Sequence, residues 1–272
     1  MTDHPWHLRH PAPFSQGTTA ITGIESAPGT GMAFEVVALA PGEVRQEVFQ
    51  EESAWLLMEG HAGLTWPGGS AEVSRDSLFE ELPTVLHLPP EAPLRIEARS
   101  PVEFARIRVP NERTFDPRLF DPASAPPEEH RDLGRWDDMA HRIVRTVIDL
   151  ASRPESNLVL GEVITLPGRW SSYPPHHHPH PEIYHYRFTR PQGYGHGELG
   201  DEVRKVRHRD TLLILDGVDH GQVAAPGYGM YYLWVIRHLP GHPYRAPEFT
   251  KDHQWLQQPG VEMPRCGSRR NP

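Results

Sequence analysis

Residues 174–182 read PPHHHPHPE, and this stretch decides how the rest of the chain is interpreted. Within it, His176, His178 and Glu182 form the pattern H-x-H-x3-E. A further histidine, His220, comes later in the chain, after another apolar run and a turn. Three imidazoles and one carboxylate are side chains that commonly bind transition metals. The pattern therefore indicates a metal site in the second half of the chain.

The spacing of the pattern agrees with side chains that share one face of a strand. Side chains alternate between the two faces of an extended strand, so His176 and His178 point the same way, and Glu182 has the same parity. With His220 they form the predicted ligand set. Such a set suits a divalent transition metal, with Zn as the first expectation and Mn, Fe, Ni or Co as alternatives. It does not suit Ca or Mg, which prefer oxygen ligands.

Two other readings of the histidine tract remain open. A run rich in histidine can be a solvated loop that binds metal only adventitiously. Within the tract, His177 has the opposite parity and is expected to face solvent or to support a ligand. His180 shares the parity of His178, so it is the one substitute ligand that the pattern allows.

Composition limits the class of protein. The chain has 272 residues with 30 Pro and 23 Gly, and these fall between short apolar runs, as in β-rich proteins with many turns. A formal charge of −9 argues against nucleic-acid binding. Cys266 is the single cysteine, which excludes an internal disulfide. Neither a membrane-spanning run nor a signal peptide is recognisable, so we expect a cytoplasmic protein without a membrane partner.

The chain divides into two halves of similar plan. Short strand-like runs are separated by turns, and the turn Pro41-Gly42 after an apolar run is matched by Pro167-Gly168 after another. This predicts an all-β protein with two domains of the sandwich or barrel type, at residues 1–115 and 141–272. Residues 116–140 are rich in Pro, Asp and Glu and are predicted to be a linker.

The first half has no counterpart of the histidine tract. Residues 46–52 offer only acidic and amide side chains as polar candidates, and His61 and His87 are isolated. We expect these two histidines to be packing or surface residues. The first domain is thus expected to be a structural partner without a metal site.

The tract and its surroundings resemble the cupins, which are double-stranded β-helix (jelly-roll) proteins with a metal inside the barrel. More narrowly, residues 170–176, Glu182, residues 191–193, residues 218–220 and residues 231–233 resemble the bicupin 5-deoxy-glucuronate isomerases of inositol catabolism. The similarity extends over nearly the whole chain, and its specific motifs lie in residues 161–236.

This resemblance implies an aldose–ketose isomerase that converts 5-deoxy-glucuronate to 5-dehydro-2-deoxy-gluconate with the help of the metal. Alternatives are another metal-dependent cupin enzyme, such as a dioxygenase, and a non-enzymatic sugar-binding bicupin. Because sheet-rich bicupins commonly pair through their edges, we expect a homo-oligomer.

A uronate substrate suggests further site residues. By parity from Glu182, Tyr184 and Tyr186 face inward and are the candidate catalytic residues. His185, Tyr231 and Tyr232 are further candidates for the base. Two neutral side chains, Tyr173 and Gln192, are candidates for binding sugar hydroxyls. Two guanidinium groups, those of Arg187 and Arg237, are candidates for binding the carboxylate.

Overall fold

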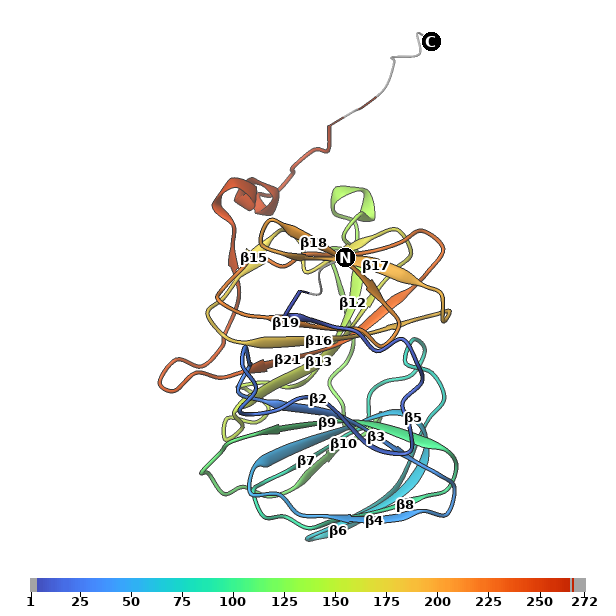
Figure 1. The fold of residues 1–272 in the computed structure, drawn as a ribbon. Coiled ribbons are helices and arrows are strands. Elements are labelled where there is room, and N and C mark those ends of the chain that lie inside the picture. Colours follow the sequence, from blue (N-terminus) through green and yellow to red (C-terminus); the bar gives the residue numbers. More distant parts are fainter. Residues whose placement is uncertain (1–3, 265, 267–272) are drawn as a thin grey trace.

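The structure, a computed structural model, describes residues 4–264 and 266 and is almost entirely built from strands (Figure 1). The helical elements in these residues are two short 3-10 segments, η1 (Trp136–Asp138) and η2 (Lys251–Gln257). No helix among the described residues is long and apolar enough to cross a membrane. The all-β fold expected from the sequence is confirmed.

The two halves have the same strand order. The strands of the first half are β2 (Gly17–Thr22), β3 (Ala33–Leu39), β4 (Val44–Glu47), β5 (Glu52–Trp66), β6 (Gly69–Arg75), β7 (Val85–Leu88), β8 (Leu94–Ala98) and β9 (Val102–Val109). Those of the second half are β12 (Arg142–Ile148), β13 (Leu158–Thr165), β14 (Trp170–Ser171), β15 (His176–His177), β16 (Glu182–Phe188), β17 (Tyr194–Leu199), β18 (Glu202–Arg207), β19 (Thr211–Ile214), β20 (Gln222–Ala224), β21 (Met230–Arg237) and β22 (Glu248–Phe249). One sheet contains the order β7-β5-β9-β3-β2, and another contains β19-β16-β21-β13-β12.

Short terminal and connecting strands cross between the predicted domains. Strand β1 (His7–Leu8) pairs with β19, so the start of the chain belongs to the sheet of the second half. Within the predicted linker, β10 (Arg118–Phe120) pairs with β7 and β11 (Glu129–Arg131) pairs with β12. The two ends of the predicted linker are therefore held by hydrogen bonds to opposite halves.

The sheets of the blue-to-teal and yellow-to-red halves stack in layers (Figure 1). Three apolar cores lie between these layers. In the first half, side chains such as Trp55, Leu57 and Phe104 fill the space between its two sheets. A second core, which includes Phe34 and Leu233, lies between the facing sheets of the two halves. A third, rich in tyrosine, lies inside the second half between β16 and the sheet of β14, β20, β17 and β18.

Buried polar groups also join the halves. The guanidinium of Arg75 donates to both carboxylate oxygens of Glu162 at 2.6 and 2.9 Å, and both side chains are almost fully buried. Glu52 accepts hydrogen bonds from Asn111 (2.6 Å) and from the backbone N–H of Asn157 (2.9 Å). These pairs fix the orientation of one half against the other.

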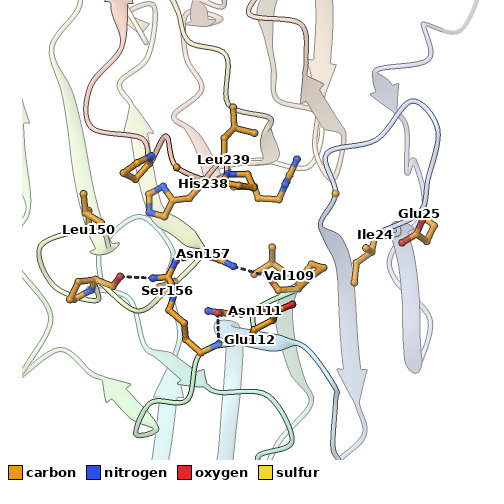
Figure 2. Close-up of a pocket in the computed structure, with 18 residues that line it drawn as sticks. Ile24, Glu25, Val109, Asn111, Glu112, Leu150, Ser156, Asn157, His238 and Leu239 are labelled. Carbon is orange, nitrogen blue, oxygen red and sulfur yellow. Dashed lines mark hydrogen bonds between the residues drawn. The ribbon is translucent and has the colours of Figure 1, made fainter.

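A cleft of about 790 Å³ opens beside the second of these contacts. In Figure 2, His238 and Leu239 lie on one wall, and Val109 and Asn111 face them from the other. The cleft also includes Arg237 and is separate from the histidine tract.

Candidate metal centre

The structure brings three of the four predicted ligands together inside the second half. His178 lies in the loop after β15, Glu182 begins β16, and His220 lies in the loop before β20. One potential ligand atom from each lies within 4.8 Å of the other two, and all three side chains are buried. No other such group of histidine, cysteine or acidic residues occurs among the described residues.

Backbone carbonyls orient the two histidines of this group. The Nδ1 atom of His178 lies 3.0 Å from the carbonyl oxygen of His180, and Nδ1 of His220 lies 2.9 Å from that of Val218. A carbonyl oxygen can only accept, so each Nδ1 carries the hydrogen. In a neutral ring the opposite nitrogen, Nε2, then has a free lone pair, which is the arrangement of most metal-binding histidines.

The carboxylate of Glu182 faces both free nitrogens. Its Oε2 atom lies 3.3 Å from Nε2 of His178 and 3.3 Å from Nε2 of His220. Oε2 and the Nε2 of His220 are buried and have no hydrogen-bond partner among the described residues. Burial opposes charge on these groups, but the attraction between the carboxylate and the imidazoles outweighs it: it lowers the pKa of Glu182 to about 2 and raises the pKa of His220.

This donor set fits a transition metal. Three lone-pair donors that converge in a buried space need a positive species between them, either a shared proton or a metal cation. Imidazole nitrogens and one carboxylate are ligands that divalent transition metals prefer. The fixed tautomers leave the lone pairs available without further rearrangement.

The fourth predicted ligand, His176, lies next to this group but outside it. Its ring centroid is 4.6 Å from that of His220, and its Nδ1 lies 3.1 Å from the carbonyl oxygen of Pro174. Burial, followed by the neighbouring His220, lowers the pKa of His176 to about 3, so the ring is neutral. His176 lines the cavity that opens onto this group and has the tautomer that a fourth ligand requires.

The other two histidines of the tract turn away from the cluster. The ring of His177 lies 2.8 Å from Oδ1 of Asp219, which also accepts a hydrogen bond from Thr250. His180 places Nε2 2.8 Å from the carbonyl oxygen of His242. The substitution of His180 for a ligand, which the sequence left open, does not occur in this arrangement.

A cavity of about 370 Å³ opens onto the cluster. Its walls include Tyr184 of β16, Tyr232 of β21 and Ser172. The hydroxyl of Ser172 lies 3.1 Å from the hydroxyls of both tyrosines, and it is held there by a left-handed backbone with φ of 50°. Such a conformation is costly for a residue other than glycine, which is a pattern found at functional sites.

The predicted catalytic tyrosines separate in the structure. Tyr184 lines the cavity, whereas Tyr186 lies deeper in the core and donates to Oε1 of Gln222 at 2.7 Å. The expectation that both serve the site is corrected for Tyr186. Burial, with the charge of Glu182, raises the pKa of Tyr184 well above its ordinary value, so the phenol keeps its proton at neutral pH.

The three further candidates for the base also lie on different faces of the sheet. Tyr232 lies in the cavity, but His185 and Tyr231 lie on the opposite face of the sheet, toward the first half. The hydroxyl of Tyr231 donates to Glu162 at 2.7 Å.

Of the predicted substrate-binding residues, only Tyr173 lines the cavity. Arg187 has the parity of His185 and bonds to Glu103 of the first half. Gln192 lies in an exposed turn, and Arg237 donates from Nε to the carbonyl oxygen of Thr30 at 2.7 Å in the cleft of Figure 2. The placement of these three residues at the site is therefore corrected.

The cavity contains cationic side chains that sequence reasoning missed. Arg131 of β11 and Arg142 of β12 both line it. Arg142 shares its parity with Val144, an inward-facing core residue, so alternation along β12 was a usable signal. Arg131 gave no such signal, because it lies in the predicted linker, where the sequence offers no alternating pattern.

Comparison with known proteins agrees with this geometry. Residues 7–256 match the KduI/IolB family. The chain belongs to this family. The resemblance to 5-deoxy-glucuronate isomerases is thereby confirmed.

Curated relatives cover most of the chain. One is a 5-deoxy-glucuronate isomerase of Geobacillus thermodenitrificans, 29% identical over 91% of this chain and 94% of the relative. Another, from Halalkalibacterium halodurans, has the same name and is 27% identical over 92% of this chain and 98% of the relative.

Solved structures show the same fold. An IolB-like protein from Salmonella typhimurium LT2 has a TM-score of 0.80 at 24% identity and covers 90% of this chain and 97% of its own. An oxalate decarboxylase variant from Bacillus subtilis has a TM-score of 0.61 at 14% identity and covers 89% of this chain and 77% of its own. At these identities the likeness confirms the cupin-like fold and does not extend to the reaction.

Proposed function

We propose that this protein is a metal-dependent 5-deoxy-glucuronate isomerase. The observation that carries the proposal is the buried group of His178, Glu182 and His220 at the base of a cavity, in a chain whose curated relatives have this activity as their name. The predicted reaction converts 5-deoxy-glucuronate, an aldehyde sugar acid, to the ketone 5-dehydro-2-deoxy-gluconate.

An aldose–ketose isomerisation takes the proton from C2, returns it to C1 and moves a second proton between the two oxygens. When bound, a divalent transition metal supplies Lewis-acid polarisation of these oxygens. His178, Glu182, His220 and the neighbouring His176 are the residues proposed to hold it. Zn remains the first expectation, with Mn, Fe, Ni or Co as alternatives.

The phenol of Tyr184 is proposed to act on the reacting oxygens. It lines the cavity, keeps its proton at neutral pH and is oriented by Ser172. A protonated phenol is a hydrogen-bond donor, which can stabilise negative charge on an oxygen in the transition state. Tyr173, on another wall of the cavity, is proposed to bind a sugar hydroxyl.

Anaerobic turnover tests the proposal. We expect purified, metal-loaded protein to convert 5-deoxy-glucuronate without oxygen, with the ketone product followed by NMR. Turnover that requires oxygen would indicate a dioxygenase, and sugar binding without turnover would indicate a binding protein. The cytoplasmic location and the homo-oligomeric state remain predictions from the sequence.

A further inference from the structure

We propose that Arg142 binds the carboxylate of the substrate and so fixes which end of the sugar acid reaches the metal cluster. The inference rests on the proposed isomerase function and deepens it. It replaces Arg187 and Arg237, which the structure places outside the cavity.

The position of Arg142 suits this role. It begins β12 and lines the same cavity as His178 and Glu182, and its side chain is 13% exposed. Its Nη1 atom donates to the carbonyl oxygen of Ala140 at 3.1 Å and to Asp132. The Nε and Nη2 atoms have no hydrogen-bond partner among the described residues, which leaves one edge of the guanidinium free for a carboxylate.

Asp132 braces Arg142 without neutralising the region. Oδ1 of Asp132 accepts a hydrogen bond from Arg135 at 3.0 Å, while Oδ2 faces Arg142. One carboxylate is thus shared by two guanidinium groups, and the pair of arginines keeps a net positive charge. A fixed guanidinium loses less side-chain entropy on binding than a free one.

The other arginine of the cavity is less suited. The side chain of Arg131 is 44% exposed and its Nε donates to Oε2 of the exposed Glu129 at 2.9 Å. An exposed ion pair of this kind is screened by water and contributes little to binding. Among the described residues that line the cavity, Arg142 is therefore the better-ordered permanent cation.

A row of hydroxyl groups lines the cavity together with Arg142 and the metal cluster. Tyr232 lines the same cavity as Arg142. Tyr232 is joined through Ser172 to Tyr184, the neighbour of the cluster. A sugar acid whose carboxylate meets Arg142 can extend past these hydroxyls and present its aldehyde end to His178, Glu182 and His220.

The test compares two substrates in one variant. The neutral analogue is 5-deoxy-glucose, which has a hydroxymethyl group where the uronate has its carboxylate. Loss of a charge-assisted, bidentate contact should lower kcat/KM of Arg142→Gln for 5-deoxy-glucuronate by about 100-fold, chiefly through KM. Its kcat/KM for the neutral analogue and its metal content should stay within about 3-fold of wild type.

Two further variants separate this contact from a general structural effect. Arg131→Gln is the matched control in the same cavity and should change kcat/KM for the uronate by less than about 3-fold. Arg142→Lys keeps the positive charge but lacks the bidentate geometry of a guanidinium. Its kcat/KM for the uronate should be about 10-fold higher than that of Arg142→Gln. If Arg142→Gln does not fold, Arg142→Lys serves as the test variant. The quantity compared with wild type is then the ratio of kcat/KM for the uronate to kcat/KM for the neutral analogue.

The inference is overturned if the Arg142 variants lose activity equally on both substrates, or if Arg131→Gln has the larger effect on the uronate. These outcomes can be distinguished from a failure of the proposed isomerase function. Wild-type protein that is loaded with metal and does not turn over 5-deoxy-glucuronate refutes the isomerase and the inference together. An active wild type with an unaffected Arg142→Gln refutes only the inference.

Discussion

The two halves of the molecule share one fold, and only the second has a candidate reaction centre. Their central sheets have matching strand orders, in which β3 and β13 occupy equivalent places. Each of these strands is followed by a turn, where Gly42 and Gly168 have φ of 80° and 73°. Positive φ at both positions explains why each turn uses glycine. The difference between the halves therefore lies in side chains and loops rather than in strand arrangement.

Strand register identifies the corresponding residues. Ser53 is the first residue of β5 that pairs with both neighbouring strands, and Glu182 has this place in β16. The same register sets Trp55 against Tyr184. In the first half these positions hold a buried serine and a tryptophan of the apolar core, whereas in the second they hold a carboxylate and a phenol beside a cavity. The same strand arrangement therefore accommodates either set of side chains.

The largest expected difference between the halves concerns metal. Glu182→Gln and His220→Ala should each remove bound metal and lower kcat by on the order of 10⁴-fold, because each takes away a donor from a group of three buried ligands. Metal content is measured by emission spectroscopy and kcat by the NMR assay. Ser53→Ala, the matched change in the first half, should leave both unchanged.

Chelation gives an independent check on the same ligands. Removing metal should lower the melting temperature of the wild type by several degrees, because a ligand that binds only the folded state stabilises it. The melting temperature of Glu182→Gln should not respond to the chelator. Full metal content in both ligand variants would show that the cluster has been assigned wrongly.

Part of this site could be predicted from the sequence, and part of it could not. Alternation and the H-x-H-x3-E spacing were sufficient for His178, Glu182 and Tyr184. The same rule, applied strictly, would have placed Arg187 on the opposite face, where it meets Glu103. His176 lies outside the close group because β15 is only two residues long and the prolines around it prevent a continuous strand.

Residues from distant segments were harder to predict. Arg131 lies on β11, a short strand inside the predicted linker, and its pairing with β12 depends on tertiary packing rather than on local propensity. The same holds for β1, whose two residues join the sheet of the other half. Composition identified the connection as polar but contained no signal for its partners.

The contact between the halves should be the next most sensitive feature. Arg75→Met leaves Glu162 charged and buried without its bidentate partner, and should cost about 3–5 kcal/mol of unfolding free energy. Chemical denaturation measures this change. The double variant Arg75→Met/Glu162→Gln removes the charge as well and should recover most of the loss.

Metal content should be unchanged in the folded Arg75→Met protein, because Glu162 faces the first half rather than the cavity. A single variant as stable as wild type would mean that the ion pair does not hold the halves together. A variant that loses metal would mean that the halves are coupled more tightly than their separate cores indicate.

A smaller effect is expected from the two inward tyrosines of β16. Tyr184→Phe removes a hydroxyl from the cavity and should lower kcat by about 30-fold, within the range for loss of one stabilising donor. Tyr186→Phe removes the bond to Gln222 in the core, and should cost about 1 kcal/mol of stability while kcat stays within about 3-fold. Equal effects of both variants on kcat would contradict the separation of the two residues seen here.

The smallest expected difference is an acid sensitivity of the second half that arises from His208. Burial, followed by the charges of Arg187 and Arg209, lowers the pKa of His208 to about 4, and its Nδ1 accepts the N–H of Phe188 at 3.2 Å. Below pH 6.5 the unfolded chain binds a proton at this residue and the folded chain does not, so stability should fall from about pH 6.5 down to about pH 4. Because the ring is only partly buried, we expect the contribution to be about 1–2 kcal/mol. His208→Asn retains an acceptor for Phe188 and should flatten the fall by this amount, when unfolding free energies at pH 8 and pH 4.5 are compared by denaturant titration. If the variant and the wild type lose the same stability between these two pH values, His208 is not the group that makes the second half sensitive to acid.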